Sequence, residues 1–368
     1  MRDGLAGRRA RRALAGGALL AVFAVVPAAL AAYGDGYPYR LAELLMIFSI
    51  LAASLNLVAG TAGLVSLGHA AFYAVGAYAA GLLATRTGLG LEATLPASAL
   101  AGGVAAGLVA LPAIRLVRVF FTVATLSAGE IIGFVLTNWD GLTNGPMGVR
   151  GIPRFRLFSL DLGSRLATYY VIAAVTTAAI YAVHRLTCSF YGNALRTLRE
   201  DDQSAAAMGL DVHLLKVGVF AIGGALAGMA GCLFAHSVGF ISPDMFGLNE
   251  SILMLTMVVV GGLGSWPGAV VGAGALILLP ELGRSAGHFR MVAVGLVLFR
   301  SLVLMPRGLL SEARTLRFLR GHSPRQPQGE RELPRGCGDG DMVPVNHPDD
   351  MLRRPPSHPW PSIRGKRQ

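Results

Sequence analysis

The sequence predicts an all-α membrane protein that crosses the bilayer repeatedly, with about eight to ten transmembrane helices. Of its 368 residues, 53% are hydrophobic and only 14% are charged, and its mean hydropathy is +0.55. A soluble domain carries about 25% charged residues, so this chain has too few charges to cover a surface that faces water. Its apolar runs are continuous and rich in Ala, Leu, Val and Gly, unlike the alternating strands of a transmembrane barrel.

Apolar stretches that favour membrane helices recur along the chain. They cover residues 13–32, 41–60, 63–83, 95–114, 119–139, 166–186, 217–239, 251–279 and 291–305. The first follows a basic flank at residues 1–12 and ends in an Ala-Leu-Ala sequence that is also typical of signal-peptide cleavage sites. Because the apolar core of a signal peptide has only about 7–15 residues, we favour an uncleaved helix with its N-terminus in the cytoplasm. We expect one transmembrane domain over residues 13–310.

From about residue 311 the chain changes character. Residues 311–368 are rich in Pro, Arg and Gly and contain few apolar residues. Such a segment cannot bury enough apolar surface to fold alone, so we expect a disordered, basic cytoplasmic tail. Contact with anionic membrane lipid is one interpretation of its charge, and an inert extension is the other.

Charge and motifs exclude several classes of function. The net charge of +11 does not indicate a nucleic-acid partner, because the basic residues gather at the chain ends and in loops, as in an oriented membrane protein. The three cysteines, Cys188, Cys232 and Cys337, have no metal-site or disulfide spacing. The phosphate-binding pattern G-x-x-x-x-G-K-[ST] is absent. We therefore expect no enzyme, no cofactor and no metal site.

A long polar run interrupts the apolar spans in a loop that covers residues 187–216. Residues 193–200 favour a short helix with leucines on one side and arginines near another. Asp201 or Asp202 is suited to cap a second short helix, which Gly209 is suited to end. Two capped helices between membrane spans favour a docking site for a cytoplasmic partner, and an ordinary solvated loop is the alternative.

The apolar stretch 251–279 is too long and too broken for one straight helix. Its centre, GGLGSWPG at residues 261–268, combines glycines of low helix propensity with a proline that fits the first turn of a new helix. We predict two half-helices that return to the same side of the membrane, because the last span then leaves the basic tail in the cytoplasm. Irregular backbone in a membrane must be buried by protein or line a cavity, so we expect the break near the protein centre.

A few polar side chains lie inside apolar segments. Glu130 is the clearest carboxylate among them, and such groups are candidates for function, with a packed carboxylate near a helix end as the alternative. His69 is more typical of a structural histidine than of a ligand contact. Asn56 and Ser66 favour hydrogen bonds between helices.

Several stretches together resemble the permease subunits of branched-chain amino-acid ABC importers, in matching order and spacing from about residue 40 to 310. The resemblance is carried by residues 55–83, 125–153, 192–235, 241–246, 257–273 and 305–310. The LTNGPMGVRGIP segment, residues 142–153, is more similar to the M-type subunit of the Liv permeases than to the H-type.

This resemblance implies a multi-pass protein of the bacterial inner membrane that works by alternating access. It implies a second permease subunit, two cytoplasmic ATP-binding subunits and an external substrate-binding protein as partners. The residues that it assigns to coupling with the ATPase are Arg196, Arg199, Glu200, Ala205, Ala206 and Gly209. The candidate residues of the translocation path are Ser66, His69, Glu130, Gly261, Gly262, Gly264 and Ser265.

Other functions stay open from the sequence. A stand-alone secondary transporter would need several ionisable residues inside the membrane, whereas Glu130 stands nearly alone in this sequence. The motifs do not exclude a permease of the same family for urea or short amides. A membrane scaffold without transport fits the glycine break poorly.

Overall fold

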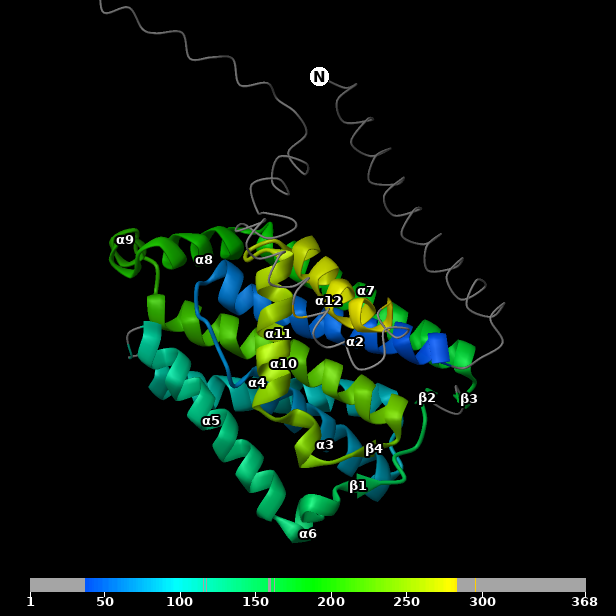
Figure 1. The fold of residues 1–368 in the computed structure, drawn as a ribbon. Coiled ribbons are helices and arrows are strands. Elements are labelled where there is room, and N and C mark those ends of the chain that lie inside the picture. The colour runs from blue at the N-terminus through cyan, green and yellow to red at the C-terminus, as the bar shows by residue number, and fades with distance from the viewer. Residues whose placement is uncertain are drawn as a thin grey trace, which may run out of the picture. The chain divides into compact units, whose positions relative to one another are not determined.

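The computed structural model describes residues 37–114, 116, 118–157, 160–161, 163–282 and 295, and these residues form the all-α membrane protein that the sequence predicts (Figure 1). The helices in chain order are α2 (Tyr37–Leu55), the π-helix η1 (Asn56–Thr61), α3 (His69–Thr87), α4 (Leu91–Ala113), α5 (Arg118–Asn138), α6 (Asp140–Thr143), the 3-10 helix η2 (Gly145–Met147), α7 (Arg165–Thr187), α8 (Phe190–Glu200), α9 (Asp202–Ala207), α10 (Val212–Val238), the 3-10 helix η3 (Pro243–Phe246), α11 (Leu248–Gly261) and α12 (Trp266–Leu282). The short strands are β1 (Val149–Arg150), β2 (Arg156–Leu157), β3 (Leu160–Asp161) and β4 (Phe240–Ile241).

Six stretches of the described chain are helical, long enough and apolar enough to cross a membrane. They are Tyr37–Thr61, Leu91–Ala113, Val119–Asn138, Arg165–Thr187, Val212–Val238 and Pro243–Gly261. The shorter α12 is also apolar. The expected number of helices is thus confirmed in part, because the predicted spans 13–32 and 291–305 and the predicted tail lie outside the described residues.

The centre of the bundle is the packing of α10 against α3 and α4, and it depends on glycines. A Cβ added to Gly76 of α3 would lie 2.2 Å from the Cα of Gly228 on α10. A Cβ on Gly102 of α4 would lie 2.4 Å from the carbonyl oxygen of Gly224. The backbones therefore touch directly, as is common where small residues line membrane helix interfaces.

We expect Gly76→Leu to destabilise the folded chain strongly, because the new side chain would meet the backbone of α10 and the helices would have to separate. Overpacking of this kind costs about 1–3 kcal/mol or more. The matched control is Gly274→Leu on α12, where a Cβ meets nothing within 4 Å in the described structure. Thermal unfolding in detergent should show a lower midpoint for Gly76→Leu only, and equal midpoints would contradict this packing.

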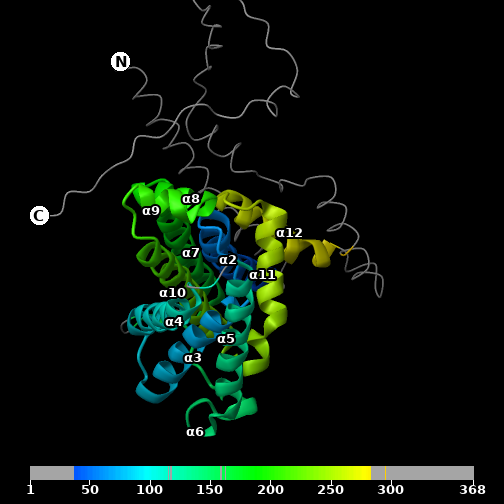
Figure 2. The same cartoon turned by 90° about the vertical axis from the view of Figure 1, so that its left-hand side faces the viewer.

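The bundle has two ends. At one end α8 and α9 lie across the helices, with the Nη1 of Arg199 donating to the carbonyl of Gly60 at the end of η1. At the opposite end β1 pairs antiparallel with β4, with Val149 opposite Ile241. Both views show α8 and α9 at one extreme and α6 at the other (Figures 1 and 2).

Helices α11 and α12 form a hairpin around the glycine break, as the sequence predicts, but its first arm is not a half-helix, because Pro243–Gly261 is long enough to cross a membrane. They approach closely beside the break, where a Cβ on Gly261 would lie 2.0 Å from the carbonyl oxygen of Gly268. α12 then runs antiparallel to α2, because the backbone N–H of Gly264 donates to Asn56 near one end and Tyr37 Oη donates to Glu281 at the other. The Tyr37 end of α2 is also the end where Ser237 of α10 donates to Glu43, just before β4 and the start of α11. The hairpin therefore returns to the β1–β4 end from which it started.

Some predicted boundaries differ from the structure. Helix α3 begins at His69 rather than at residue 63, because Gly63 has a φ of +75° and the chain after it is irregular. The polar loop is shorter than 187–216, because α10 begins at Val212 with Asp211 as its cap. Lys216 fits inside that helix because its ammonium group pairs with Asp202 of α9.

Candidate functional site

Helices α8 and α9 form a compact unit at one end of the bundle, here called the α8–α9 unit. Leu195 and Leu198 of α8 are fully buried in the core, as the predicted apolar side requires. Tyr191 Oη donates to the carbonyl of Leu215 on α10, and burial raises the pKa of Tyr191 to about 12, so its hydroxyl stays protonated and able to donate. The outer side of the unit, which includes Glu200 and Met208, is exposed.

The local signals of the sequence explain α9. Both side-chain oxygens of Asp201 accept first-turn backbone N–H groups, those of Gln203 and Ser204. Gly209, with a φ of +79°, takes the left-handed conformation that ends the helix. The prediction of two capped helices is confirmed, with Asp201 as the cap.

The predicted coupling residues divide into an inner and an outer set. Ala205 is fully buried, and Arg199 reaches inward to Gly60 with an N–O distance of 2.6 Å. Arg196 bonds to Asn193 within α8. Glu200, Ala206 and Gly209 are exposed.

Sequence reasoning missed one feature of this surface. Met208, at the end of α9, is 72% exposed in the most polar part of the chain, and Leu214 in the first turn of α10 is 71% exposed. Single exposed apolar side chains are common on protein surfaces, so these two residues mark a contact surface only together with the capped helices around them. The signal was present in the sequence as a methionine between an alanine run and a glycine.

The glycine break lies next to the α8–α9 unit. Gly262, with φ +117° and ψ +114°, ends α11, and Gly264 has a φ of +84°. Ser265 directly precedes α12, and its side-chain oxygen accepts the N–H of Gly268 in the first turn of that helix. The glycines of the break and Ser265 are buried by protein, as predicted. The break lies at the α8–α9 end rather than midway along the bundle, because Gly264 bonds to Asn56, the first residue of η1 after the end of α2.

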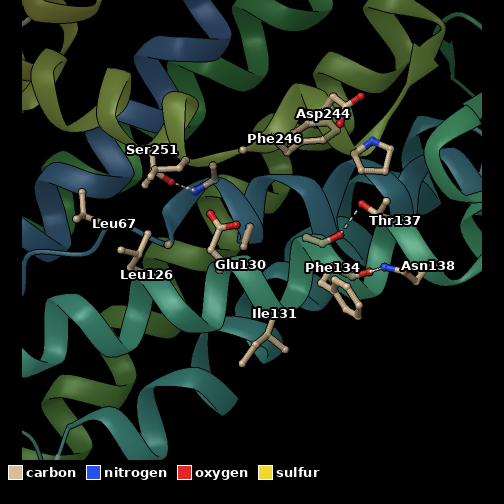
Figure 3. A pocket seen from close by; sticks show the side chains of 18 residues that line it. Leu67, Leu126, Glu130, Ile131, Phe134, Thr137, Asn138, Asp244, Phe246 and Ser251 are labelled. Atoms are coloured by element: carbon tan, nitrogen blue, oxygen red, sulfur yellow. Dashed lines mark hydrogen bonds between the residues drawn. The ribbon is translucent and has the colours of Figure 1, made fainter.

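A cavity of about 740 Å³ opens between α5, the start of α3 and the η3–α11 junction. Figure 3 shows Glu130 of α5 pointing across it toward Ser251 and Phe246. Its volume lies in the range of small-molecule sites, which is roughly 300–1,000 Å³. Apolar side chains dominate the lining, and Glu130 and Asp244 add carboxylates. Of the described residues that line it, none is basic.

Close backbone contacts build this cavity. A Cβ on Gly68 would lie 2.0 Å from the carbonyl oxygen of Thr125, so α5 crosses the start of α3 where no side chain fits. The N–H of Ala70 donates to Ser251 Oγ at 3.0 Å, which ties α3 to α11. The first turn of α11, at Gly247 and Leu248, also faces the cavity.

The structure brings only one of the predicted path residues, Glu130, to this cavity. Ser66 is fully buried and does not line it. His69 is also buried, and its Nε2 lies 2.8 Å from Ser54 Oγ, which fits a structural histidine. The glycines of the break and Ser265 belong to the other end. Sequence reasoning missed Asp244 and Ser251, which come from a segment with no periodic signal.

A bundle of helices that are long and apolar enough to cross a membrane, with a glycine-broken hairpin and a pair of short helices across one end, defines a multi-pass all-α membrane protein. Residues 37–305 match the family described as branched-chain amino acid transport system, permease component. The chain belongs to this family.

Individual relatives agree with the family. The chain is 34% identical over 297 residues to LivM, a high-affinity branched-chain amino acid transport system permease protein of Escherichia coli, which covers 74% of this chain and 70% of the relative. It is 26% identical over 284 residues to LivH of Salmonella typhimurium, covering 72% and 91%. It is 22% identical to a probable LivM of Methanocaldococcus jannaschii, covering 64% and 78%. The higher identity to LivM agrees with the M-type resemblance, and no solved structure matches the chain.

Proposed function

We propose that this chain is a permease subunit of an ABC importer that carries branched-chain amino acids across the bacterial inner membrane. The family match from residue 37 to 305 is the observation that supports this most, because it covers the bundle, the hairpin and the α8–α9 unit. Cells that lack the chain should lose ATP-dependent uptake of leucine, isoleucine and valine and regain it with the chain restored. Unchanged uptake of all three would contradict the proposal.

The proposed importer contains a second permease subunit, two cytoplasmic ATP-binding subunits and an external binding protein. The character of α5 supports the second permease. Only 11% of the apolar stretch of this helix is buried within the chain, and Glu130 is one of its exposed residues. A carboxylate that faces lipid is costly, so this face of α5 fits a protein partner or a water-filled path.

The proposed docking site for an ATP-binding subunit is the α8–α9 unit. Its inner side is fixed to the bundle by buried leucines, by Arg199 and by the Lys216–Asp202 pair. Its outer side offers Met208 among charged residues such as Glu200. Because the inner side of the unit is fixed to the bundle, a partner that binds its exposed outer side at Met208 could move the bundle with it.

The proposed translocation path runs through the cavity beside Glu130. A branched-chain amino acid carries an ammonium group, a carboxylate and an aliphatic side chain. Glu130 is suited to the ammonium group, and the start of α11 at Gly247 and Leu248 is suited to the carboxylate, because the N-terminus of a helix favours an anion. Leu67, Leu126 and Phe134 offer apolar surface for the side chain.

We expect Glu130→Gln to weaken transport, because the amide is similar in shape but cannot balance an ammonium charge. A hydrogen bond to a charged group contributes about 1.5–3 kcal/mol, so half-maximal uptake should need roughly tenfold more ligand, delivered by the binding protein. The measurement is the concentration dependence of uptake in proteoliposomes that contain the whole importer.

The matched control is Ser127→Ala, one turn earlier on α5. Ser127 is also exposed, but its hydroxyl bonds only to Val123 of its own helix. An unchanged concentration dependence in Glu130→Gln would place the path elsewhere. Competition by urea but not by leucine would favour the alternative cargo, because urea has no ammonium group.

A further inference from the structure

A short π-helix, η1, joins α2 to the irregular chain before α3. It covers Asn56–Thr61, and all six residues are buried. Just beyond it the N–H of Leu64 donates back to the carbonyl of Val58. Turns of this type inside longer helices are rare and are frequent at functional sites.

One side of η1 contacts the α8–α9 unit. Arg199 Nη1 donates to the carbonyl oxygen of Gly60 at 2.6 Å. The stem of the same arginine lies against Gly63, where a Cβ would be 2.9 Å from Arg199 Cγ. The guanidinium of Arg199 thus contacts Gly60 in η1, and its aliphatic part contacts Gly63 just after η1. A displacement of α8 would therefore act on η1 directly.

The other side of η1 contacts the glycine break. Asn56 Oδ1 accepts the backbone N–H of Gly264 at 2.9 Å, and the asparagine is 2% exposed. Gly60 completes the contact, since a Cβ on it would lie 2.3 Å from the nitrogen of Gly264 and 2.1 Å from Asn56 Oδ1. The turn and the break thus touch with no space between their backbones.

We infer that η1 is a mechanical link between the α8–α9 unit and the α11–α12 hairpin, with Arg199 and Asn56 as the positioning residues at its two ends. This inference rests on the proposed docking of an ATP-binding subunit at the α8–α9 unit. The glycine break does not line the Glu130 cavity, so it does not contact a ligand there. The inference gives the break a mechanical role instead.

The break is suited to be moved by such a link. Between Gly262 and Ser265 the chain is outside both helices, with two residues in conformations that glycine favours. Gly264 of the break is tied to η1 by its bond to the buried Asn56, beside the close backbone contact with Gly60. Moving the break reorients α12, which packs along α2, and α11, whose first turn faces the cavity.

The first experiment compares Asn56→Leu with Asn56→Asp in the complete importer, reconstituted with its binding protein. Leucine removes the acceptor for Gly264, whereas aspartate keeps an oxygen in the same place. For Asn56→Leu we expect uptake per ATP hydrolysed to fall by about fivefold or more, the lower end of the range for coupled sites, while ATP-binding subunits still associate. Asn56→Asp should recover most of the coupling.

The matched control is Ser49→Ala, earlier on α2. Ser49 is as buried as Asn56, but its hydroxyl donates only to Leu45 of its own helix. Normal coupling in Asn56→Leu would overturn the link. A loss that Asn56→Asp does not recover, with Ser49→Ala normal, would also overturn it, since the hydrogen bond would then not be the cause.

A second measurement reads the movement itself. Leu263, in the break, is 38% exposed, and Leu263→Cys can be labelled with a maleimide in a chain in which Cys188 and Cys337 are replaced by serine. ATP should change the labelling rate in this background, and Asn56→Leu or Arg199→Leu should remove that change. An ATP effect that survives both substitutions would overturn the link.

These outcomes separate the link from the function on which it rests. Ala206→Pro in α9 tests the docking site without touching η1. If that variant hydrolyses ATP and transports normally, the proposed docking is wrong. If it is uncoupled but Asn56→Leu is coupled, the docking stands and the link is wrong.

Discussion

Ala206→Pro should abolish most uptake while the chain remains folded in the membrane. Proline cannot donate the helical N–H and clashes with the preceding turn, at a cost of about 3 kcal/mol in a helix interior. α9 has only six residues and little stability of its own. Its loss would displace exposed Met208 and the left-handed turn at Gly209, so uptake should fall by at least about tenfold. The measurements are ligand-stimulated ATPase activity and uptake in the same proteoliposomes.

The control for this prediction is Ala206→Ser, because Ala206 is exposed and serine keeps the backbone N–H. Glu200→Arg provides an independent variant on α8, since it reverses the charge of an exposed residue at the end of that helix. It too should uncouple ATP hydrolysis from uptake. Normal ligand-stimulated ATPase and normal uptake in both Ala206→Pro and Glu200→Arg would exclude the α8–α9 unit as the docking site.

The sequence predicted the α8–α9 unit well because local chemistry determines it. A capping aspartate, a glycine that tolerates positive φ and a pair of leucines three residues apart all act within one or two helical turns. Structure was needed for what the unit contacts. The bond from Arg199 to Gly60 joins residues 139 positions apart, and no local pattern encodes it.

The glycine break illustrates a different limit. Its hairpin could be predicted because the sidedness of charge restricts how often the chain crosses the membrane. Its depth could not, because that depends on the contact of Gly264 with Asn56, 208 positions earlier. The expectation that an irregular stretch lies at the protein centre considered burial alone, and burial is also satisfied at the α8–α9 end.

Of the residues that line the cavity, the sequence analysis had named only Glu130 as a candidate for the path. Glu130 is conspicuous because a carboxylate in an apolar helix is costly. Its neighbours come from three separate parts of the chain, and Gly68 and Gly129 determine how closely α3 and α5 approach. A contact between two glycines has no side-chain signal, so the sequence did not reveal the cavity that they shape.

Gly262→Leu is expected to remove uptake nearly completely. Gly262 has φ +117° and ψ +114°, a conformation that side chains with a Cβ strongly disfavour, at a cost of about 1–3 kcal/mol. Its N–H also closes the last turn of α11 by donating to Val258, so a change of backbone there would misplace both α11 and the following Gly264. Uptake and the amount of assembled importer should be measured together. We expect Gly264→Leu, with φ +84°, to behave in the same way.

Leu263→Ala is the control within the break, because Leu263 is partly exposed and is not among the described residues with positive φ. It should transport nearly normally. Unchanged uptake in Gly262→Leu and Gly264→Leu would exclude any role of the break in transport. Association with the ATP-binding subunits distinguishes the two ends of the proposed link. It should persist in Gly262→Leu, whose α8–α9 unit is intact, and weaken in Ala206→Pro, because the break acts after docking and α9 is part of the docking surface itself.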